Sequence, residues 1–252
     1  FFAALERDLL VYVPDRIAEG YGPNAPALLQ LKEQGVSLVI TVDCGTTAFA
    51  PLETAAAAGL DIVVVDHHVA EPLLPTAVAV VNPNRLDETS PVGQLCAAGM
   101  TFMLIIAINR ALRDACWYGE GHGEPDLMNM LDLVALATVA DVVPLTGINR
   151  ALVRKGLAIM KKRENPGLAA LADVSRLEET LDAWHLGFLL GPRVNAGGRV
   201  GEAGLGVKLL TTVDRDEATG IAVRLDEYNT ERREIEAAVL DAAMAQAEQQ
   251  AD

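Results

Sequence analysis

Short apolar runs alternate with segments of helical composition in the N-terminal part of the chain. The apolar runs are Leu9–Val13, Val36–Val42, Ile62–Val65 and Val78–Val81. Each run has the length of a β-strand and ends at polar or turn-forming residues, so we predict a strand at each. The run Ile62–Val65 consists only of β-branched residues, which is typical of a strand buried on both faces at the centre of a sheet.

Two of these runs should belong to one βαβ unit. The segment between Val36–Val42 and Ile62–Val65 is rich in alanine, can be capped by Thr46 or Thr47, and ends at Gly59, so we predict a helix there. The crossover in a βαβ unit makes its two strands parallel neighbours. Both strands therefore deliver the residues that follow them to the same edge of the sheet, where open α/β sheets bind their ligands.

Polar residues that can bind a metal ion follow both strands. Asp43 comes after the first strand, and Asp66, His67 and His68 come after the second. A set of carboxylate oxygens and imidazole nitrogens suits manganese, zinc or iron better than calcium. Taken alone, the Asp-His-His triplet could equally cap the next turn through local hydrogen bonds, so both interpretations stay open at this point.

Apolar helices make up the middle of the chain. We predict buried helices at Ala97–Leu112 and Leu127–Val139, and a helix with a basic end at Asn149–Lys162. The second of them runs into Asp141, an acidic residue in an apolar segment. Such a residue is costly to bury unless it is paired or bound to a metal, although Asp141 could also cap the following turn.

The segment Gly191–Gly201 is rich in glycine and contains Arg193, Asn195 and Arg199. We predict a loop here, because glycine allows the backbone to approach a ligand closely. Arginine side chains and exposed backbone N–H groups bind phosphate well, so the loop is a candidate phosphate-binding element. A tight turn with solvated arginines is the alternative.

A long helix is predicted for the C-terminal part of the chain. From Asp216 onward there is no proline and a single glycine, Gly220, while apolar residues recur at helical spacing. This pattern indicates a helix of about 30 residues. We therefore predict an α/β fold with a mostly parallel sheet flanked by helices, in a domain at 1–215, and a connector helix at 216–252 that leads to a C-terminal domain.

The composition limits the classes of function. Hydrophobic residues make up 51% of the 252 residues but aromatic residues only 4%, so the core must be built from aliphatic residues and alanine. The formal net charge of -15 argues against a generally basic, nucleic-acid-binding surface, although a local basic groove remains compatible with it. Three cysteines without CxxC spacing predict free thiols in the reducing cytoplasm. No apolar run approaches the roughly 20 residues that a membrane span requires.

Several motifs, taken in order along the chain, resemble those of a known family. They are Pro14-Asp15-Arg16 with Glu19-Gly20-Tyr21-Gly22, Thr41–Gly45, Val65–His68, Asn82-Pro83-Asn84, Thr138–Leu145 and Gly191–Arg199. This arrangement is similar to that of the DHH phosphoesterases and, within them, of the RecJ-type single-strand-specific 5′→3′ DNA exonucleases. The Asp-His-His triplet marks the wider family, whereas the last three motifs together are specific to the RecJ type.

The resemblance implies metal-dependent hydrolysis of phosphodiester bonds. It implies two divalent ions, normally Mn²⁺ with Mg²⁺ as the other choice, and assigns Asp43, His67 and Asp141 as their ligands. In the same assignment His68 contacts the scissile phosphate, and Asp66 orients an imidazole without itself binding the metal. A carboxylate suits a position between two cations, and a neutral imidazole suits a terminal ligand.

The resemblance also implies the partners of the protein. Its substrate would be single-stranded DNA in repair and recombination, with Arg193, Asn195 and Arg199 holding DNA phosphates. A single-strand-binding protein or another repair protein would be a further partner, in the cytoplasm and away from membranes. The resemblance leaves the oligomeric state open.

Two parts of the family pattern have no match in this sequence. The family's first Asp-rich motif, after its opening strand, is expected before Phe1, and its further domains are expected after the long helix. We therefore expect the chain to be most of the catalytic domain of a longer enzyme. By itself it should bind metal weakly and be inactive, because part of the ligand set is missing.

Three other functions remain open. A related enzyme on the same fold could act on short oligonucleotides, cyclic dinucleotides or pyrophosphate. A second alternative is a catalytically inactive scaffold in a replication complex, which the intact candidate ligands Asp43, His67 and Asp141 argue against. The third is an unrelated α/β binding domain without a metal, which the order of the motifs argues against.

Overall fold

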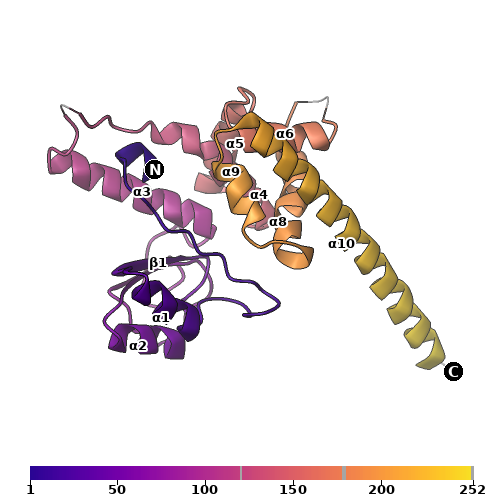
Figure 1. Ribbon diagram of the computed structural model, residues 1–252, viewed down its shortest axis with the longest axis horizontal. Coiled ribbons are helices and arrows are strands. Elements are labelled where there is room, and N and C mark those ends of the chain that lie inside the picture. The colour runs from indigo at the N-terminus through magenta and orange to yellow at the C-terminus, as the bar shows by residue number, and fades with distance from the viewer. Residues whose placement is uncertain (120, 178–179, 251–252) are drawn as a thin grey trace. The chain divides into compact units, whose positions relative to one another are not determined.

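The computed structural model describes residues 1–119, 121–177 and 180–250, which fold into two compact units (Figure 1). The first unit comprises Phe1–Pro14 and Glu19–Ile159, and the second comprises Asp15–Ala18 and the chain from Met160 onward. In the described ranges, no helix combines the length and the apolar character needed to cross a bilayer.

A parallel sheet forms the centre of the first unit. Its strands are β1 (Leu38–Val42), β2 (Asp61–Val65) and β3 (Ala79–Val81), in the order β1-β2-β3. The predicted parallel pairing of β1 and β2 is confirmed, with Val42 opposite Val65, so the two strands end at the same level. The sheet is mostly apolar and β2 is its central strand, as its β-branched residues indicated.

Helices cover both faces of this sheet. They are α1 (Ala25–Glu33), α2 (Phe49–Ala57), α3 (Ala97–Asp114), α4 (Leu131–Ala140) and α5 (Gly147–Met160), with the 3-10 turns η1 (Ala3–Leu5) and η2 (Leu127–Met130). Ile62 and Val64 of β2 pack with residues of α1 and α2, whereas Val63 and Val65 pack with residues of α3, α4 and α5. Because alternate side chains of a strand point to opposite faces, a strand covered on both sides must be apolar throughout.

Two local predictions are wrong in this unit. Leu9–Val13 forms no strand, and its side chains are exposed by 37% to 58%. The run has strand propensity, but a strand also needs a hydrogen-bonded neighbour, and these residues do not pair with the sheet. Thr46 and Thr47 do not cap α2, whose N-cap is Ala48 without a side-chain hydrogen bond.

The second unit is helical throughout its described residues. Its elements are α6 (Pro166–Val174), α7 (Ala183–His185), the π-helical segment η3 (Leu186–Leu190), α8 (Gly191–Val200), α9 (Leu205–Thr211) and α10 (Arg215–Gln250). The elements α7, η3 and α8 follow one another without a break, so residues 183–200 form one continuous helix.

The glycine-rich segment is a helix and not the predicted loop. It forms α8, with its proline in the first turn, where a backbone N–H is not needed. A Cβ atom on Gly201 would lie 2.1 Å from the ring of Tyr228, and one on Gly197 would lie 3.0 Å from Leu225 Cδ2. Tyr228 and Leu225 belong to α10, so these glycines allow two helices to pack closely and do not open the backbone to a ligand.

The predicted C-terminal helix is confirmed, and at 36 residues α10 is longer than expected. Its first part packs against α6, α8 and α9, where Ala218, Ala222 and Leu225 are fully buried. Farther along, apolar side chains such as Val239 and Met244 are exposed by 63% and 57%. The helix therefore belongs to the core of the second unit only over its first half.

Candidate metal centre

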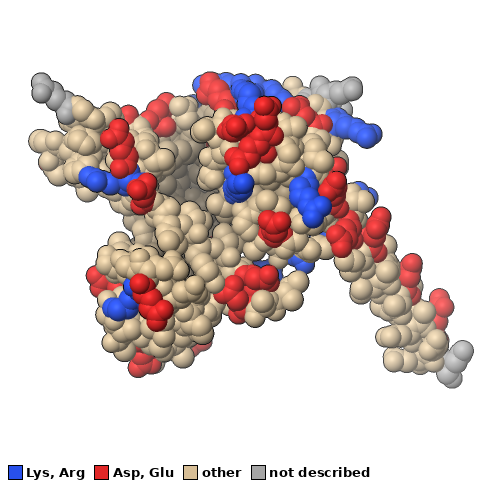
Figure 2. Space-filling view, in the orientation of Figure 1, with Lys and Arg blue, Asp and Glu red and all other residues tan. Residues whose placement is uncertain are grey.

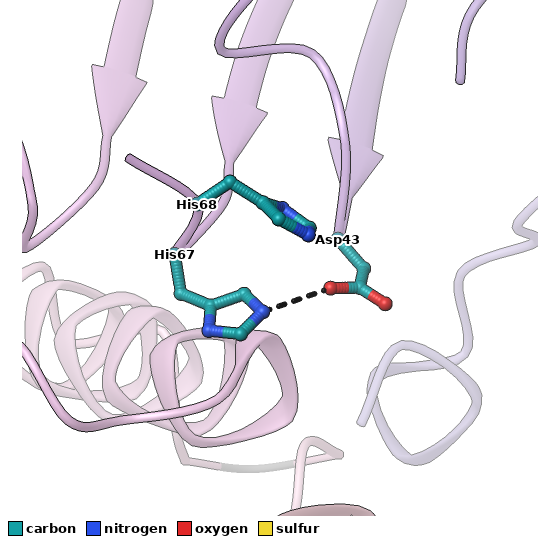
Figure 3. A group of neighbouring side chains, drawn as sticks. All are labelled: Asp43, His67 and His68. Carbon is teal, nitrogen blue, oxygen red and sulfur yellow. Dashed lines mark ion pairs between the residues drawn. The ribbon is translucent and has the colours of Figure 1, made fainter. Parts of the chain in front are cut away.

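The ends of β1 and β2 bring the predicted site residues to one edge of the sheet (Figure 3). The backbone N–H of Asp43, just after β1, donates to Val65 O at 3.0 Å. The N–H of Asp66, just after β2, donates in the same way to Val81 O at 3.0 Å. These bonds extend the parallel pairing by one residue on each strand, so Asp43 and His67 leave the sheet side by side.

Asp43 leaves the strand through a tight turn. Its φ is 63°, in the left-handed region that aspartate tolerates better than most residues. Gly45 has a φ of 111°, and a Cβ atom there would lie 2.7 Å from Thr41 Oγ1. The Thr41 hydroxyl also donates to Cys44 O at 3.1 Å, which closes the turn. The short sequence Asp43-Cys44-Gly45 therefore sets the direction of the Asp43 carboxylate.

Side chains from three separate segments meet at His67. Its Nε2 lies 3.3 Å from Asp43 Oδ1 and 3.4 Å from Asp141 Oδ2. This nitrogen is buried, and it makes no hydrogen bond with any residue that the structure describes. A buried nitrogen without a hydrogen bond is costly, but such a nitrogen suits a metal ion. Asp43 and Asp141 thus both approach His67, as predicted, and carboxylate and imidazole donors suit a divalent transition metal.

His68 lies beside the same cluster. One candidate ligand atom each from Asp43, His67 and His68 lies within 4.8 Å of the other two (Figure 3). Asp43 and His67 therefore form a compact group with His68 among the described residues, and Asp141 approaches this group at His67. Any metal bound here would depend most strongly on Asp43 and His67.

Asp66 orients the ring of His68. The buried carboxylate places Oδ1 2.7 Å from His68 Nδ1 and accepts hydrogen bonds from the N–H groups of His67 at 2.8 Å and Thr46 at 3.1 Å. Burial raises the pKa of Asp66, but these hydrogen bonds outweigh burial and lower the pKa to about 2. An ionised Asp66 requires the proton of the His68 ring on Nδ1, which leaves Nε2 to face a ligand.

Burial, hydrogen bonding and the neighbouring charges shift two further pKa values. Burial lowers the pKa of His68, but the hydrogen bond to Asp66 and the nearby carboxylates outweigh burial, and the net shift is upward. The pKa of Asp43 is raised, first by its partial burial, with His67 acting against this and Asp141 adding to it. Carboxylates that crowd together in this way are stabilised by a bound cation.

Tyr21 is a site residue that sequence reasoning did not identify. Its hydroxyl donates to Asp43 O at 2.7 Å and lies 3.5 Å from His68 Nε2. Tyr21 therefore links the turn after β1 to the second histidine. The motif Glu19–Gly22, one of those that carry the family resemblance, is the signal that could have pointed to it.

Asn82 and Asn84 hold the backbone of the two histidines. The Asn82 side-chain amide donates to His68 O at 2.8 Å and to Thr46 Oγ1 at 2.9 Å. The Asn84 amide donates to His67 O at 2.5 Å. The sequence indicated only a turn at Asn82-Pro83-Asn84, because the carbonyl groups that these amides bind lie more than ten residues earlier in the chain.

We expect Asn82→Ala to lower the free energy of unfolding by about 1–3 kcal/mol. The substitution removes the partners of two acceptors, of which the Thr46 side chain is 1% exposed. Asn129→Ala is the control, because the Asn129 side chain is exposed and its loss should change stability by no more than about 0.5 kcal/mol. Urea unfolding measures both, and equal effects would contradict a structural role for Asn82.

The predicted phosphate-binding residues lie on α8 of the second unit. Arg193 donates from Nε to Asp226 Oδ1 and from Nη1 to Leu189 O, both at 2.8 Å. Asn195 and Arg199 are exposed, and Arg199 forms no ion pair within the described ranges. Arg193 thus joins α8 to α10, whereas Asn195 and Arg199 are open to a ligand. On the face drawn in Figure 2, basic side chains are interspersed with acidic ones.

Comparison with known families identifies the family to which this chain belongs. Residues 1–138 match the model of the DHH family, N-terminal domain. The chain belongs to the DHH family. Among individual proteins it is similar to the single-stranded-DNA-specific exonuclease RecJ of Dickeya dadantii, with 42% identity over 234 residues. It is similar also to the enzyme of the same name from Escherichia coli, with 40% identity over 227 residues.

The alignments cover most of this chain but only part of the relatives. They span 92% of this chain and 41% of the Dickeya protein, and 89% of this chain and 39% of the Escherichia coli protein. The chain therefore spans about two fifths of the length of the curated relatives it matches.

Solved structures agree with the sequence comparison. The fold is similar to a crystal structure of exonuclease RecJ bound to manganese, with a TM-score of 0.84, 34% identity, and coverage of 97% of this chain and 59% of that one. It is similar also to RecJ from Thermus thermophilus in complex with Mn²⁺, with a TM-score of 0.80 and 32% identity. That alignment covers 97% of this chain and 34% of the other.

Proposed function

We propose that the protein hydrolyses phosphodiester bonds of single-stranded DNA with the help of divalent metal ions. The observation that carries this proposal is the buried Nε2 of His67, which makes no hydrogen bond with a described residue and faces the carboxylates of Asp43 and Asp141. The names of its relatives, single-stranded-DNA-specific exonucleases, support the choice of substrate. We propose further that the enzyme digests from the 5′ end and serves DNA repair and recombination.

Asp43, His67 and Asp141 would hold the metal. Mn²⁺ is the ion we propose, with Mg²⁺ as the alternative, since related structures are described as bound to manganese and to magnesium. The family resemblance implies two ions. A bound divalent ion would supply Lewis acidity at the phosphate and lower the pKa of a bound water molecule.

His68 would stabilise the negative charge that develops on the scissile phosphate. Asp66 fixes the ring through Nδ1, so Nε2 is the nitrogen that can meet a phosphate oxygen. The raised pKa of His68 favours the doubly protonated ring, in which Nε2 carries a proton and can donate it in a hydrogen bond. Asp66 is thus a positioning residue, and His68 is the residue that would touch the substrate.

Arg193, Asn195 and Arg199 would bind phosphates along the DNA strand. Asn195 and Arg199 are exposed and suit this role directly. Arg193 already has an acidic partner in Asp226, so it would contribute only through whatever part of its guanidinium group remains accessible. The exposed second half of α10 supports our proposal that residues 216–252 connect the 1–215 domain to a further one. We place the enzyme in the cytoplasm, with a single-strand-binding protein as a further partner.

An end-labelled digestion assay tests the function. The natural protein that carries this chain should release nucleotides from the 5′ end of single-stranded DNA in the presence of Mn²⁺, and a chelator should stop the reaction. Duplex DNA, RNA, a cyclic dinucleotide and pyrophosphate are the competing substrates. Intact single-stranded DNA beside hydrolysis of one of the small substrates would overturn the proposal in favour of a small-molecule phosphodiesterase or phosphatase.

A further inference from the structure

An exposed pair of stacked aromatic rings lies on the second unit. Trp184 and Phe188 are exposed by 56% and 67%, and their ring centroids lie 5.5 Å apart with an interplanar angle of 27°. The chain contains only 2 tryptophans and 5 phenylalanines. Large aromatic side chains are mostly buried in folded proteins, so a stacked pair open to solvent indicates a binding surface.

The pair is held in place before any ligand arrives. The ring of His185 contacts Trp184 edge-on, at a centroid distance of 5.4 Å and an angle of 88°. His185 is itself buried, and its Nδ1 lies 2.7 Å from Asp182 Oδ1 in a capping box at the start of α7. Trp184 therefore lies between a fixed imidazole and Phe188. A fixed ring loses little conformational entropy on binding, which favours recognition.

The same helix face continues to two polar residues. Trp184, Phe188, Asn195 and Arg199 all lie on the continuous helix 183–200, with successive spacings of four, seven and four residues. Residues at these spacings share one face of a helix, and all four side chains are exposed. We call these four residues the aromatic–arginine row. At 1.5 Å per residue the row is about 22 Å long.

The π-helical segment η3 brings the two aromatic residues of the row closer to alignment. It covers residues 186–190, which include Phe188 and lead directly into α8. A π-turn contains more residues than an α-turn, so positions four apart lie more nearly above one another. Arg193 lies off the row, where it contacts Asp226 of α10. The helix thus separates one arginine that joins two helices from another, Arg199, that faces solvent.

We propose that the aromatic–arginine row binds single-stranded nucleic acid, with bases stacked on Trp184 and Phe188 and the phosphate backbone held by Asn195 and Arg199. The inference rests on the proposed function and adds a base-stacking site to it. Every base has a π face, so stacking on aromatic side chains suits a strand of any sequence. Arg199 supplies the positive charge that a phosphate needs.

The charges around the row favour phosphate contacts at one end and base contacts at the other. Asp182 places an exposed carboxylate next to the aromatic pair. That carboxylate repels phosphate but not the uncharged faces of bases. Phosphate contacts therefore belong to the Asn195 and Arg199 end of the row, and base contacts to the Trp184 and Phe188 end.

Tryptophan fluorescence tests the stacking directly. In the Trp117→Phe variant of this 252-residue chain, Trp184 is the only tryptophan. Titration with an oligothymidylate at low salt, with a chelator present to prevent hydrolysis, should quench this emission by about half or more, as stacking on a base does. An abasic strand of equal length, which offers phosphates without bases, should quench it far less. Trp184→Phe is the matched control, because its remaining emission comes from Trp117 in the first unit and should not change.

Binding affinity provides the second measurement. Trp184→Ala and Phe188→Ala should each weaken the binding of a labelled oligothymidylate by about 10-fold in fluorescence anisotropy, and Arg199→Gln should weaken it and reduce its salt dependence. Circular dichroism shows whether each variant keeps its helices. Both rings are exposed, so their loss should leave the fold intact.

The outcomes separate this inference from the proposed function. Oligonucleotide binding without quenching of Trp184, or no binding at low salt, overturns the stacking site, whether or not the natural protein digests DNA. Quenching as expected, together with absence of Mn²⁺-dependent digestion by the natural protein, overturns the proposed function and supports the row. A Trp184 emission that depends on protein concentration and not on DNA shows a contact between protein molecules and also overturns the inference.

Discussion

Replacing Asp43 with Asn is expected to weaken Mn²⁺ binding by about 100-fold and to leave the metal-free protein at least as stable as before. Asp43 Oδ1 lies 3.3 Å from His67 Nε2, in a cluster that also contains Asp141. Its pKa is raised by partial burial and by the charge of Asp141, against the effect of His67, so the ionised form is disfavoured in the folded state. In the metal-free protein, removing that charge relieves repulsion between the carboxylates. In the metal-bound protein, it removes a ligand.

Calorimetric titration and thermal unfolding measure the two halves of this prediction. At a Mn²⁺ concentration 100 times the dissociation constant of the parent chain, bound metal adds about 2.7 kcal/mol to its stability, and a 100-fold weaker variant would gain only about 0.4 kcal/mol. Asp173→Asn is the control, because Asp173 is an exposed partner of Arg163 in the second unit. A metal-free Asp43→Asn protein that unfolds more readily than its parent would show that Asp43 is structural.

The βαβ part of the site could be predicted from the sequence because strong local and topological rules apply there. A run of β-branched residues specifies a buried strand, and a right-handed crossover makes its neighbour parallel. Asp43 and His67 must then emerge at one edge, as the structure shows. Asp141 lies on a different element, the end of α4, and only the order of the motifs indicated that it would join them.

The glycine-rich segment shows where local reasoning fails. Glycine and proline are loop signals in isolation, but here the proline lies in the first turn of α8, and Gly197 and Gly201 face α10. The close approach of Gly201 to Tyr228 depends on a residue 27 positions away, which no window of local sequence contains. Tertiary packing decided the conformation here.

Two further outcomes depend on long-range contacts for the same reason. Thr46 lies where a helix cap is expected, yet its N–H binds Asp66 and its hydroxyl accepts from Asn82. Trp184 and Phe188 are spaced like residues on any amphipathic helix. Their exposure follows from which face of the helix the rest of the second unit covers, and that choice is visible only in the fold.

Gly156→Ala should destabilise the protein by about 2–3 kcal/mol, although the same substitution at Gly220 should stabilise it by about 0.5–1 kcal/mol. Both glycines lie inside helices, α5 and α10, where alanine has the higher helix propensity. A Cβ atom on Gly156 would lie 2.1 Å from Leu131 O and 2.4 Å from Ala135 Cβ of α4. Neither of these atoms can rotate away, so α4 and α5 must separate. A Cβ atom on Gly220 meets no atom within 4 Å.

The separation of α4 from α5 should also reach the metal centre. Asp141 is the C-cap of α4, and its carboxylate lies 3.4 Å from His67 Nε2, so a shift of the helix moves one ligand away from the others. We expect Gly156→Ala to weaken Mn²⁺ binding by about 10-fold at a temperature where the variant is folded, and Gly220→Ala to leave it unchanged. Urea unfolding and calorimetric titration measure the two effects. Lower stability with unchanged Mn²⁺ affinity would mean that the position of α4 does not control Asp141, and that the turn after α4 holds this carboxylate by itself.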